Sequence, residues 1–135
     1  MRTLHAGLRV ADRERSLAFY TALGYEVIGE VPETSLGHLT MLKLPQDPFV
    51  TLELVHDGAP VDLGDGLSHL VVQVDSIREL DAKGVEIEPP TSPDGTEDFL
   101  TAWLTDPDGR RIEIVQWPPG HTDGMTAADF SQRSR

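Results

Sequence analysis

Two histidines and two glutamates recur along the chain at spacings that would let them act together. His69 follows His5 by 64 residues, and Glu113 follows Glu53 by 60. Imidazole nitrogens and carboxylate oxygens are common ligands of divalent zinc, nickel and cobalt. Two neutral imidazoles and two carboxylates carry a charge of −2, so one divalent cation makes the set neutral and leaves coordination positions open for water or substrate. The four residues therefore predict a metal centre suited to catalysis.

The two glutamates fall in the middle of predicted strands. Apolar residues alternate through 49–55 and 111–115, which places Glu53 and Glu113 on the opposite strand face. An uncompensated buried carboxylate costs several kcal/mol, and a cation would compensate both. Taken singly, each glutamate could face solvent and each histidine could be an ordinary half-buried residue. Their joint occurrence on strands at matching positions favours the metal.

The elements that must position these residues repeat along the chain. Residues 3–10 alternate as a strand, and a helix follows, with Asp12 as its N-cap and Gly24 as its stop. We expect three further strands near 25–31, 37–44 and 49–56. His5 precedes the cap Asp12 by seven residues, and His69 precedes the second cap, Ser76, by the same number.

The second half repeats this order. It starts with a strand at 68–75 and a helix that Ser76 and Glu79 open as a capping box and Gly84 closes. Strands are expected near 84–88, 99–105 and 110–116, the last two joined by a tight turn at 106–109. The sequence thus predicts two βαβββ modules, at 1–57 and 66–117, within one compact domain, followed by a tail at 118–135. Matching positions of a duplicated unit face each other across its axis, so the four residues could converge there.

Composition narrows the function classes. The chain of 135 residues has no cysteine, which excludes thiol catalysis and a thiolate metal site. Its formal net charge of −12 would repel nucleic acid and anionic membranes. It contains no apolar run long enough to span a membrane and begins without a secretory signal. We therefore expect a soluble cytoplasmic protein.

Four segments carry a resemblance to a known family. They are MRTLHAGLRVADRERSLAFYTALGYEV, TLELV, SHLVVQVD and LTDPDGRRIEIV, the last being the most specific. Over residues 1–116 the chain resembles the vicinal-oxygen-chelate superfamily, which includes glyoxalases, bleomycin resistance proteins and dioxygenases, and within it the glyoxalase I (lactoylglutathione lyase) branch. The resemblance implies an α+β fold in which two βαβββ modules form an open mixed β-barrel around a metal site. It also implies a homodimer, since many relatives complete the site with modules from different chains.

The resemblance further implies a metal-dependent lyase. His5, Glu53, His69 and Glu113 would hold a divalent ion, with nickel, cobalt and zinc all plausible for this donor set. The substrate would be a hemithioacetal of an α-oxoaldehyde and a thiol, or a similar vicinal-oxygen compound, and it would react through an enediolate. Glu113 would act as the catalytic base, and Glu53 would act on the other side of the substrate.

Further residues are expected to line the substrate pocket. Arg9 lies four residues after His5 on the same strand face, where it could clasp a carboxylate, and its counterpart in glyoxalase I contacts glutathione. Gln73 holds the equivalent place after His69. Thr51 shares a face with Glu53, and Trp103 shares one with Phe99 and Thr101 and could form a pocket wall, although an aromatic stripe is also common in a core.

Two alternative functions stay open. A non-catalytic drug-binding or resistance protein of this fold usually lacks the metal ligands, and an extradiol iron dioxygenase uses residues corresponding to His5, His69 and Glu113 without a ligand at position 53. The thiol is also left open, because glyoxalase I relatives commonly carry basic residues before the seventh strand. Residues 86–98 of this chain have none and contain five acidic ones: Glu86, Glu88, Asp94, Glu97 and Asp98.

Overall fold

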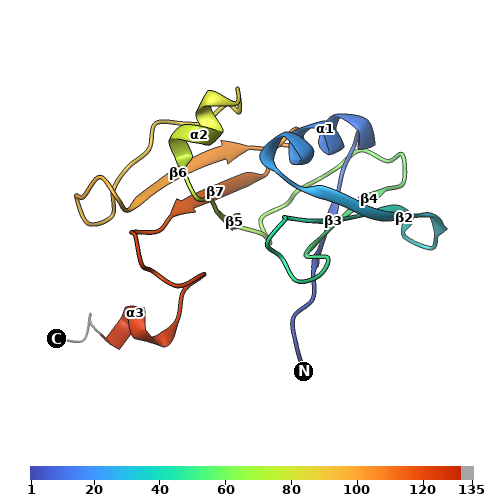
Figure 1. Cartoon of the computed structure of the whole chain (residues 1–135). Helices are drawn as coiled ribbons and strands as arrows, with labels where there is room; N and C mark the ends of the chain where they lie inside the picture. Colours follow the sequence, from blue (N-terminus) through green and yellow to red (C-terminus); the bar gives the residue numbers. More distant parts are fainter. Residues whose placement is uncertain (132–135) are drawn as a thin grey trace. The chain divides into compact units, whose positions relative to one another are not determined.

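The structure, a computed structural model, describes residues 1–131 and contains two compact units. The first unit comprises Met1–Ser68 together with Thr105–Arg111, and the second comprises His69–Leu104 together with the segment from Ile112 onward. The predicted α+β class is confirmed, in the form of two small mixed sheets (Figure 1). Residues 132–135 of the predicted tail lie outside the described residues.

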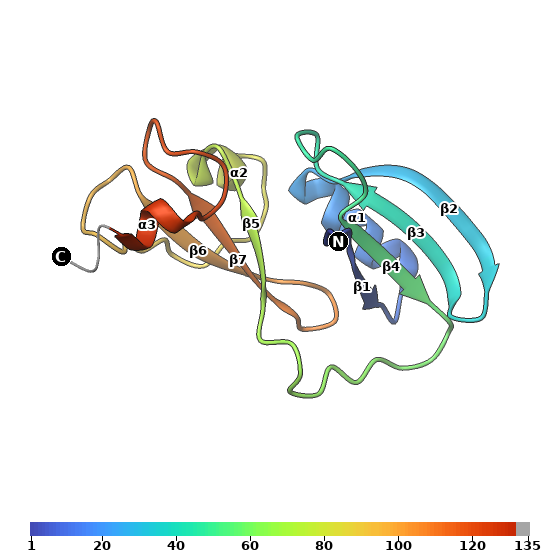
Figure 2. The ribbon, with the colours of Figure 1, turned by 90° about the horizontal axis from the view of Figure 1, so that it is seen from below.

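The first unit is built on a four-stranded sheet. Its elements are β1 (Ala6–Arg9), α1 (Arg13–Leu23), β2 (Glu26–Thr34), β3 (Gly37–Lys43) and β4 (Leu52–His56), with strand order β1-β4-β3-β2. The β1–β4 pair is parallel, whereas the other pairs are antiparallel. Helix α1 covers one face of the sheet (Figure 2). The Asp12 side chain accepts a hydrogen bond from the Arg15 amide, so the predicted N-cap is confirmed.

The core of the first unit lies between α1 and the sheet. Leu8, Leu42 and Leu54 are almost fully buried there, as is Tyr20 of α1. Because Leu8 and Leu54 are partners in the parallel β1–β4 register, their neighbours in sequence point to the other face. That alternation gives Glu53 and the residues of odd number in β1 a common face.

The second unit holds a three-stranded sheet with order β5-β7-β6. Its elements are β5 (Leu70–Gln73), α2 (Ile77–Ala82), β6 (Leu100–Thr105), β7 (Arg111–Gln116) and α3 (Ala127–Ser131). Strands β5 and β7 are parallel, and Ile112 and Ile114 of β7 are fully buried. Ser76 caps α2 by accepting a hydrogen bond from the Glu79 amide, as predicted.

One predicted strand of the second unit is wrong. Residues 84–88 form no strand in the structure, so this half reads βαββ where βαβββ was expected. The segment reaches β6 through single contacts, from the Glu88 amide to the Trp103 carbonyl and in an isolated bridge between Thr91 and Thr101. Pro89 and Pro90 interrupt it there, because proline has no amide to donate to a ladder.

The two units repeat one register. In the first, Gly7 of β1 is the parallel partner of Glu53, and in the second, Val71 of β5 is the parallel partner of Glu113. Gly7 and Val71 each follow a predicted metal-binding histidine by two residues. The internal repetition expected from cap spacing is therefore present in the strand pairing as well. In residues 1–131, no helix is long and apolar enough to cross a membrane.

Candidate metal centre

His5 and Glu53 form the first of two histidine–glutamate pairs. The Nε2 atom of His5 lies 3.0 Å from Oε2 of Glu53. Glu53 is buried, with a side chain 10% exposed, and the imidazole is about one-third exposed, at 34%. The pair forms because His5, one residue before β1, is in phase with Gly7, the parallel partner of Glu53, and Gly7 adds no side chain between them. A buried carboxylate beside a partly exposed imidazole supplies two of the four ligands that the proposed metal site needs.

His69 and Glu113 form the corresponding pair of the second unit. Nε2 of His69 lies 3.9 Å from Oε1 of Glu113, and the side chains are 35% and 25% exposed. The predicted pocket residue Trp103 stands beside them, with its ring edge-on to the His69 ring at a centroid distance of 5.2 Å. The second pair is thus looser than the first and has an aromatic wall.

The four predicted ligands are therefore brought together as two pairs, one in each unit. Among residues 1–131, no three His, Asp or Glu side chains lie close enough to hold one metal ion. The donor chemistry nevertheless fits a divalent cation, because each pair offers one imidazole nitrogen and one carboxylate on the same face of a strand pair.

Arg9 occupies the face expected for it and borders a cavity of the first unit. Its guanidinium donates to Oδ2 of Asp57 at 3.0 Å, and both side chains are largely exposed. A cavity of about 610 Å³ lies against Arg9, Asp57 and the loop at 32–37. Asp57, a partner that the sequence did not predict, therefore takes one of the five N–H donors of Arg9 and leaves others that can reach a substrate carboxylate. Thr51 instead donates its hydroxyl to Asp47 at 2.7 Å.

Gln73 is held by residues that follow β7. Its Oε1 accepts hydrogen bonds from the Trp117 indole at 2.9 Å and from the Gly124 amide at 2.8 Å. Its Nε2 donates to Oδ1 of Asp123 at 2.8 Å. Trp117 is in phase with Glu113 along the chain, and that alternation is the signal that could have placed it on the same face.

Two of the acidic residues in the loop at 86–98 lie on the α2 side of the sheet, away from the face of Glu113. Glu88 and Glu97 line a cavity of about 570 Å³ together with Ile77 of α2, Leu100 and Gln116. Leu100 and Gln116 alternate out of phase with Trp103 and Glu113, so this cavity lies on the α2 side of the sheet. Asp94 accepts hydrogen bonds from Ser92 and Thr96 in its own turn, and the bonds from Thr96 lower its pKa.

A buried network in the first unit was not foreseen. Asp106 accepts hydrogen bonds from the Tyr20 hydroxyl at 2.7 Å and from the Arg110 guanidinium at 2.8 Å. Arg110 also donates to the Arg9 carbonyl, which ties the turn to the end of β1. Burial, followed by the bond to Asp106, raises the pKa of Tyr20 far above its usual range. The turn residues that were expected only to reverse the chain therefore also anchor β1, the strand that carries Arg9 and directly follows His5.

Comparisons with known proteins show which family the sequence matches. Residues 2–114 match the family described as the Glyoxalase/Bleomycin resistance protein/Dioxygenase superfamily. A lactoylglutathione lyase of Salmonella typhimurium strain LT2 is 30% identical over 125 residues, which cover 86% of this chain and 93% of the relative. A lactoylglutathione lyase of Neisseria meningitidis serogroup A is 32% identical over 132 residues, which cover 89% and 94%.

Solved structures show the same likeness in the fold. The crystal structure of glyoxalase I from Zea mays superposes with a TM-score of 0.73 at 26% sequence identity. The superposition covers 87% of this chain and 45% of the maize chain, so this chain spans less than half of that protein.

Proposed function

Because the chain belongs to the Glyoxalase/Bleomycin resistance protein/Dioxygenase superfamily, we propose that it is a metal-dependent lyase or isomerase of the glyoxalase I type. Its substrate would be the hemithioacetal of an α-oxoaldehyde and a thiol, or a similar compound with two adjacent oxygens. His5, Glu53, His69 and Glu113 would hold the divalent ion, which is nickel, cobalt or zinc. The ion would polarise the adjacent oxygens and so acidify the carbon-bound proton.

The observation that carries this proposal is the repeated histidine–glutamate pair. Each unit places one imidazole and one carboxylate on the same face, in the same strand register. A structural role explains a single pair readily, but it gives no reason for two buried or half-buried pairs at equivalent positions. A shared cation gives that reason, because it compensates both carboxylates.

The two glutamates would divide the proton transfers. Glu113 is the more exposed carboxylate and lies farther from its histidine, so it is free to take the proton from the substrate carbon. Glu53 is buried and close to His5, which suits a group that stays in place and acts on the other side of the substrate. Trp103 would wall the reacting end, and Arg9 would bind a substrate carboxylate at the cavity it shares with Asp57.

The assembly belongs to the same proposal. We expect an open β-barrel around the metal and a homodimer in which chains share sites. The direction of Glu88 and Glu97 toward the α2 side supports keeping glutathione among the thiols, since these two carboxylates do not line the face of Glu113. Size-exclusion chromatography with light scattering checks the dimer.

Metal analysis and a hemithioacetal assay test the function together. Purified protein should retain close to one equivalent of metal per site, lose turnover on chelation and regain it with nickel, cobalt or zinc. Methylglyoxal should be offered with glutathione and with at least one thiol that has no carboxylate. Glu113→Gln should lower kcat by about 100-fold or more, the scale of a general base, while Glu14→Gln on the exposed side of α1 should leave kcat unchanged.

The opposite outcomes separate the alternatives. Full turnover after complete chelation, or wild-type kcat in Glu113→Gln, would overturn the metal-dependent lyase. Oxygen uptake with a catechol would identify a dioxygenase, and tight retention of an aromatic ligand without turnover would identify a binding protein.

A further inference from the structure

Residues 117–131, here called the C-terminal strap, fold back onto β5 of the second unit. Trp117, Asp123 and Gly124 all hydrogen-bond to the carboxamide of Gln73, at 2.8–2.9 Å. A carboxamide oxygen accepts two hydrogen bonds, so Oε1 of Gln73 has no acceptor site left for a substrate. The strap is therefore hydrogen-bonded to the Gln73 carboxamide, the polar group at the end of β5.

The occupied group lies on the same face as the second histidine–glutamate pair. Gln73 ends β5 and follows His69, the residue just before that strand, by four positions; Val71 between them is the partner of Glu113. At about 3.3 Å per residue, Gln73 stands about 13 Å along the strand from His69. A strap fastened at Gln73 covers the end of the face on which the substrate would lie.

The strap is closed by His121. Its Nδ1 lies 2.6 Å from the Thr122 carbonyl oxygen, and its Nε2 lies 2.6 Å from Oδ1 of Asp129. A carbonyl oxygen and a carboxylate accept hydrogen bonds, so this geometry favours the imidazolium, in which both ring nitrogens carry a proton. This cation stacks on the Trp117 ring at a centroid distance of 4.2 Å and an interplanar angle of 8°, an arrangement that a positive charge over an indole favours.

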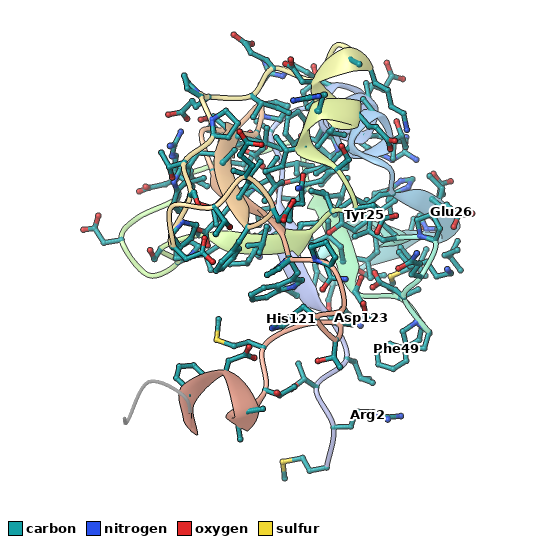
Figure 3. All side chains as sticks on the ribbon, turned by 60° about the vertical axis from the view of Figure 1, so that its left-hand side comes forward. Arg2, Tyr25, Glu26, Phe49, His121 and Asp123 are labelled. Carbon is teal, nitrogen blue, oxygen red and sulfur yellow. The ribbon has the colours of Figure 1, made fainter. Side chains whose placement is uncertain are left out.

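Within residues 1–131, Asp129 is the charged residue that hydrogen-bonds to His121. Trp117 stacks in turn on Phe99, and both rings are uncharged, as is the Gln73 carboxamide next to them. Asp123 follows His121 on the same loop (Figure 3), and it accepts a hydrogen bond from Gln73. Oδ2 of Asp129 also accepts a hydrogen bond from the Thr126 amide at the start of α3, so Asp129 connects this helix to His121.

The bond to Asp129, and after it the bond to Thr122, raises the pKa of His121. A histidine with a raised folded-state pKa contributes its stabilisation fully below its ordinary pKa of about 6.5 and loses it as the pH rises through the raised value. The bonds of His121 to Thr122 and Asp129 should therefore hold at acid pH. They should weaken as His121 becomes neutral, because one ring nitrogen then has no proton to donate and its lone pair faces an acceptor oxygen.

We propose that the C-terminal strap is a gate over the Gln73 end of the substrate face and that the imidazolium of His121 is its latch. With His121 protonated, the strap is fastened to Gln73. With His121 neutral, the strap detaches and Gln73 becomes available to substrate. The effect on catalysis rests on the proposed function, whereas the latch itself does not.

Tryptophan fluorescence tests the latch without any assay of activity. The chain has two tryptophans, so Trp103→Phe leaves Trp117 as the only one and removes the indole beside His69. Emission should be quenched by the stacked imidazolium at about pH 5 and should rise with a midpoint above about 6.5, the ordinary histidine value. In this background His121→Gln should abolish the step, Asp129→Asn should lower its midpoint, and His56→Gln, in the first unit, should leave it unchanged.

Amide exchange tests the attachment. At one pH below the fluorescence midpoint, the Gly124 amide should exchange at least several-fold faster in His121→Gln than in the unsubstituted chain, because its bond to Gln73 then opens more often. Equal exchange rates, or a fluorescence step that survives His121→Gln, would overturn the latch.

Activity then separates the gate from the proposed function. If both hold, kcat/KM of the metal-loaded enzyme rises with pH through the fluorescence midpoint, and His121→Gln raises it at acid pH. Unaltered acid-side kcat/KM in an active His121→Gln enzyme overturns the gate alone. Absence of turnover in every variant overturns the proposed function, while fluorescence and exchange still decide the latch.

Discussion

Asp106 is a buried carboxylate stabilised by several donors. Besides Tyr20 and Arg110, the amides of Asp108 and Arg110 donate to its Oδ1, at 3.0 and 2.8 Å. A buried anion with this many donors is satisfied as a network, and removing one member leaves its partners incompletely paired. The network joins α1 to the turn before β7 and, through Arg110, to the end of β1.

Tyr20→Phe should therefore destabilise the protein without creating a cavity. It deletes a hydroxyl that donates to Asp106 from a nearly fully buried position, and the loss should be about 1–2 kcal/mol. Urea unfolding measures it as a lower midpoint at an unchanged m-value.

Tyr25→Phe is the matched control for this change. Tyr25 is also a partly buried tyrosine, and burial, followed by the charge of Asp47, raises its pKa to about 12. Within residues 1–131 its hydroxyl makes no hydrogen bond to the protein, so its removal should cost less than about 0.5 kcal/mol. Equal losses in the two variants would show that the Tyr20–Asp106 bond adds no stability.

For single residues, the sequence predicts which strand face a side chain occupies better than it predicts which loop residue bonds to it. Glu53 and Glu113 could be assigned to one strand face by alternation, and the structure pairs each with the histidine of its own unit. The bonds of Gln73 and Arg9 could not be assigned. Gln73 and Arg9 donate to Asp123 and Asp57, which lie in segments without periodicity, and no rule of local spacing predicts which loop residue returns to a strand.

Among the elements, the β2–β3 hairpin depends on one glycine. Gly37 begins β3 with a φ of 122°, and a Cβ built on it would lie 2.5 Å from the His56 carbonyl oxygen. The obstacle is backbone and cannot move aside without disturbing the β3–β4 ladder. Gly37 therefore permits the close approach of β3 and β4 next to the cavity that Arg9 lines.

Gly37→Ala should lower the free energy of unfolding by more than about 2 kcal/mol, because backbone strain and steric overlap add at this position. Gly29→Ala is the control, since Gly29 lies in β2 and a Cβ there would meet no atom within 4 Å. Chemical denaturation should show little change or a slight gain for that control. Similar midpoints for the two variants would contradict the argument.

The elements predicted from caps and alternation are largely those found. The caps Asp12 and Ser76 act where they were placed, because capping is decided by a few neighbouring residues. The strand expected at 84–88 is wrong because strand formation needs a partner edge. Its alternating pattern ends in two prolines, and only isolated bonds to β6 form.

At the scale of the whole chain, the proposed ligands are divided evenly. Each unit carries one histidine and one glutamate, and two ligands hold a divalent ion far less tightly than four. The proposed metal should therefore depend equally on both units. Sequence spacing predicts this even division, whereas the sharing of one ion by both pairs stays a prediction, because local spacing does not encode it.

Metal should accordingly stabilise the chain through linkage. A saturating ion at 100 times its Kd adds about 2.7 kcal/mol to the free energy of unfolding. Urea unfolding measured with added nickel, cobalt or zinc should give a free energy of unfolding that is higher by this amount or more. Replacing either pair, as His5→Ala with Glu53→Gln or as His69→Ala with Glu113→Gln, should remove most of the rise to a similar degree.

The net charge of −12 requires a second control, because any divalent cation screens repulsion among so many carboxylates. Magnesium prefers oxygen ligands and binds imidazole poorly, so it should give only this screening effect, in the unsubstituted chain and in both double variants alike. The difference between nickel and magnesium then isolates the four-residue site. If that difference survives the loss of one pair, the metal is held within a single unit, and the even division of ligands has no part in binding.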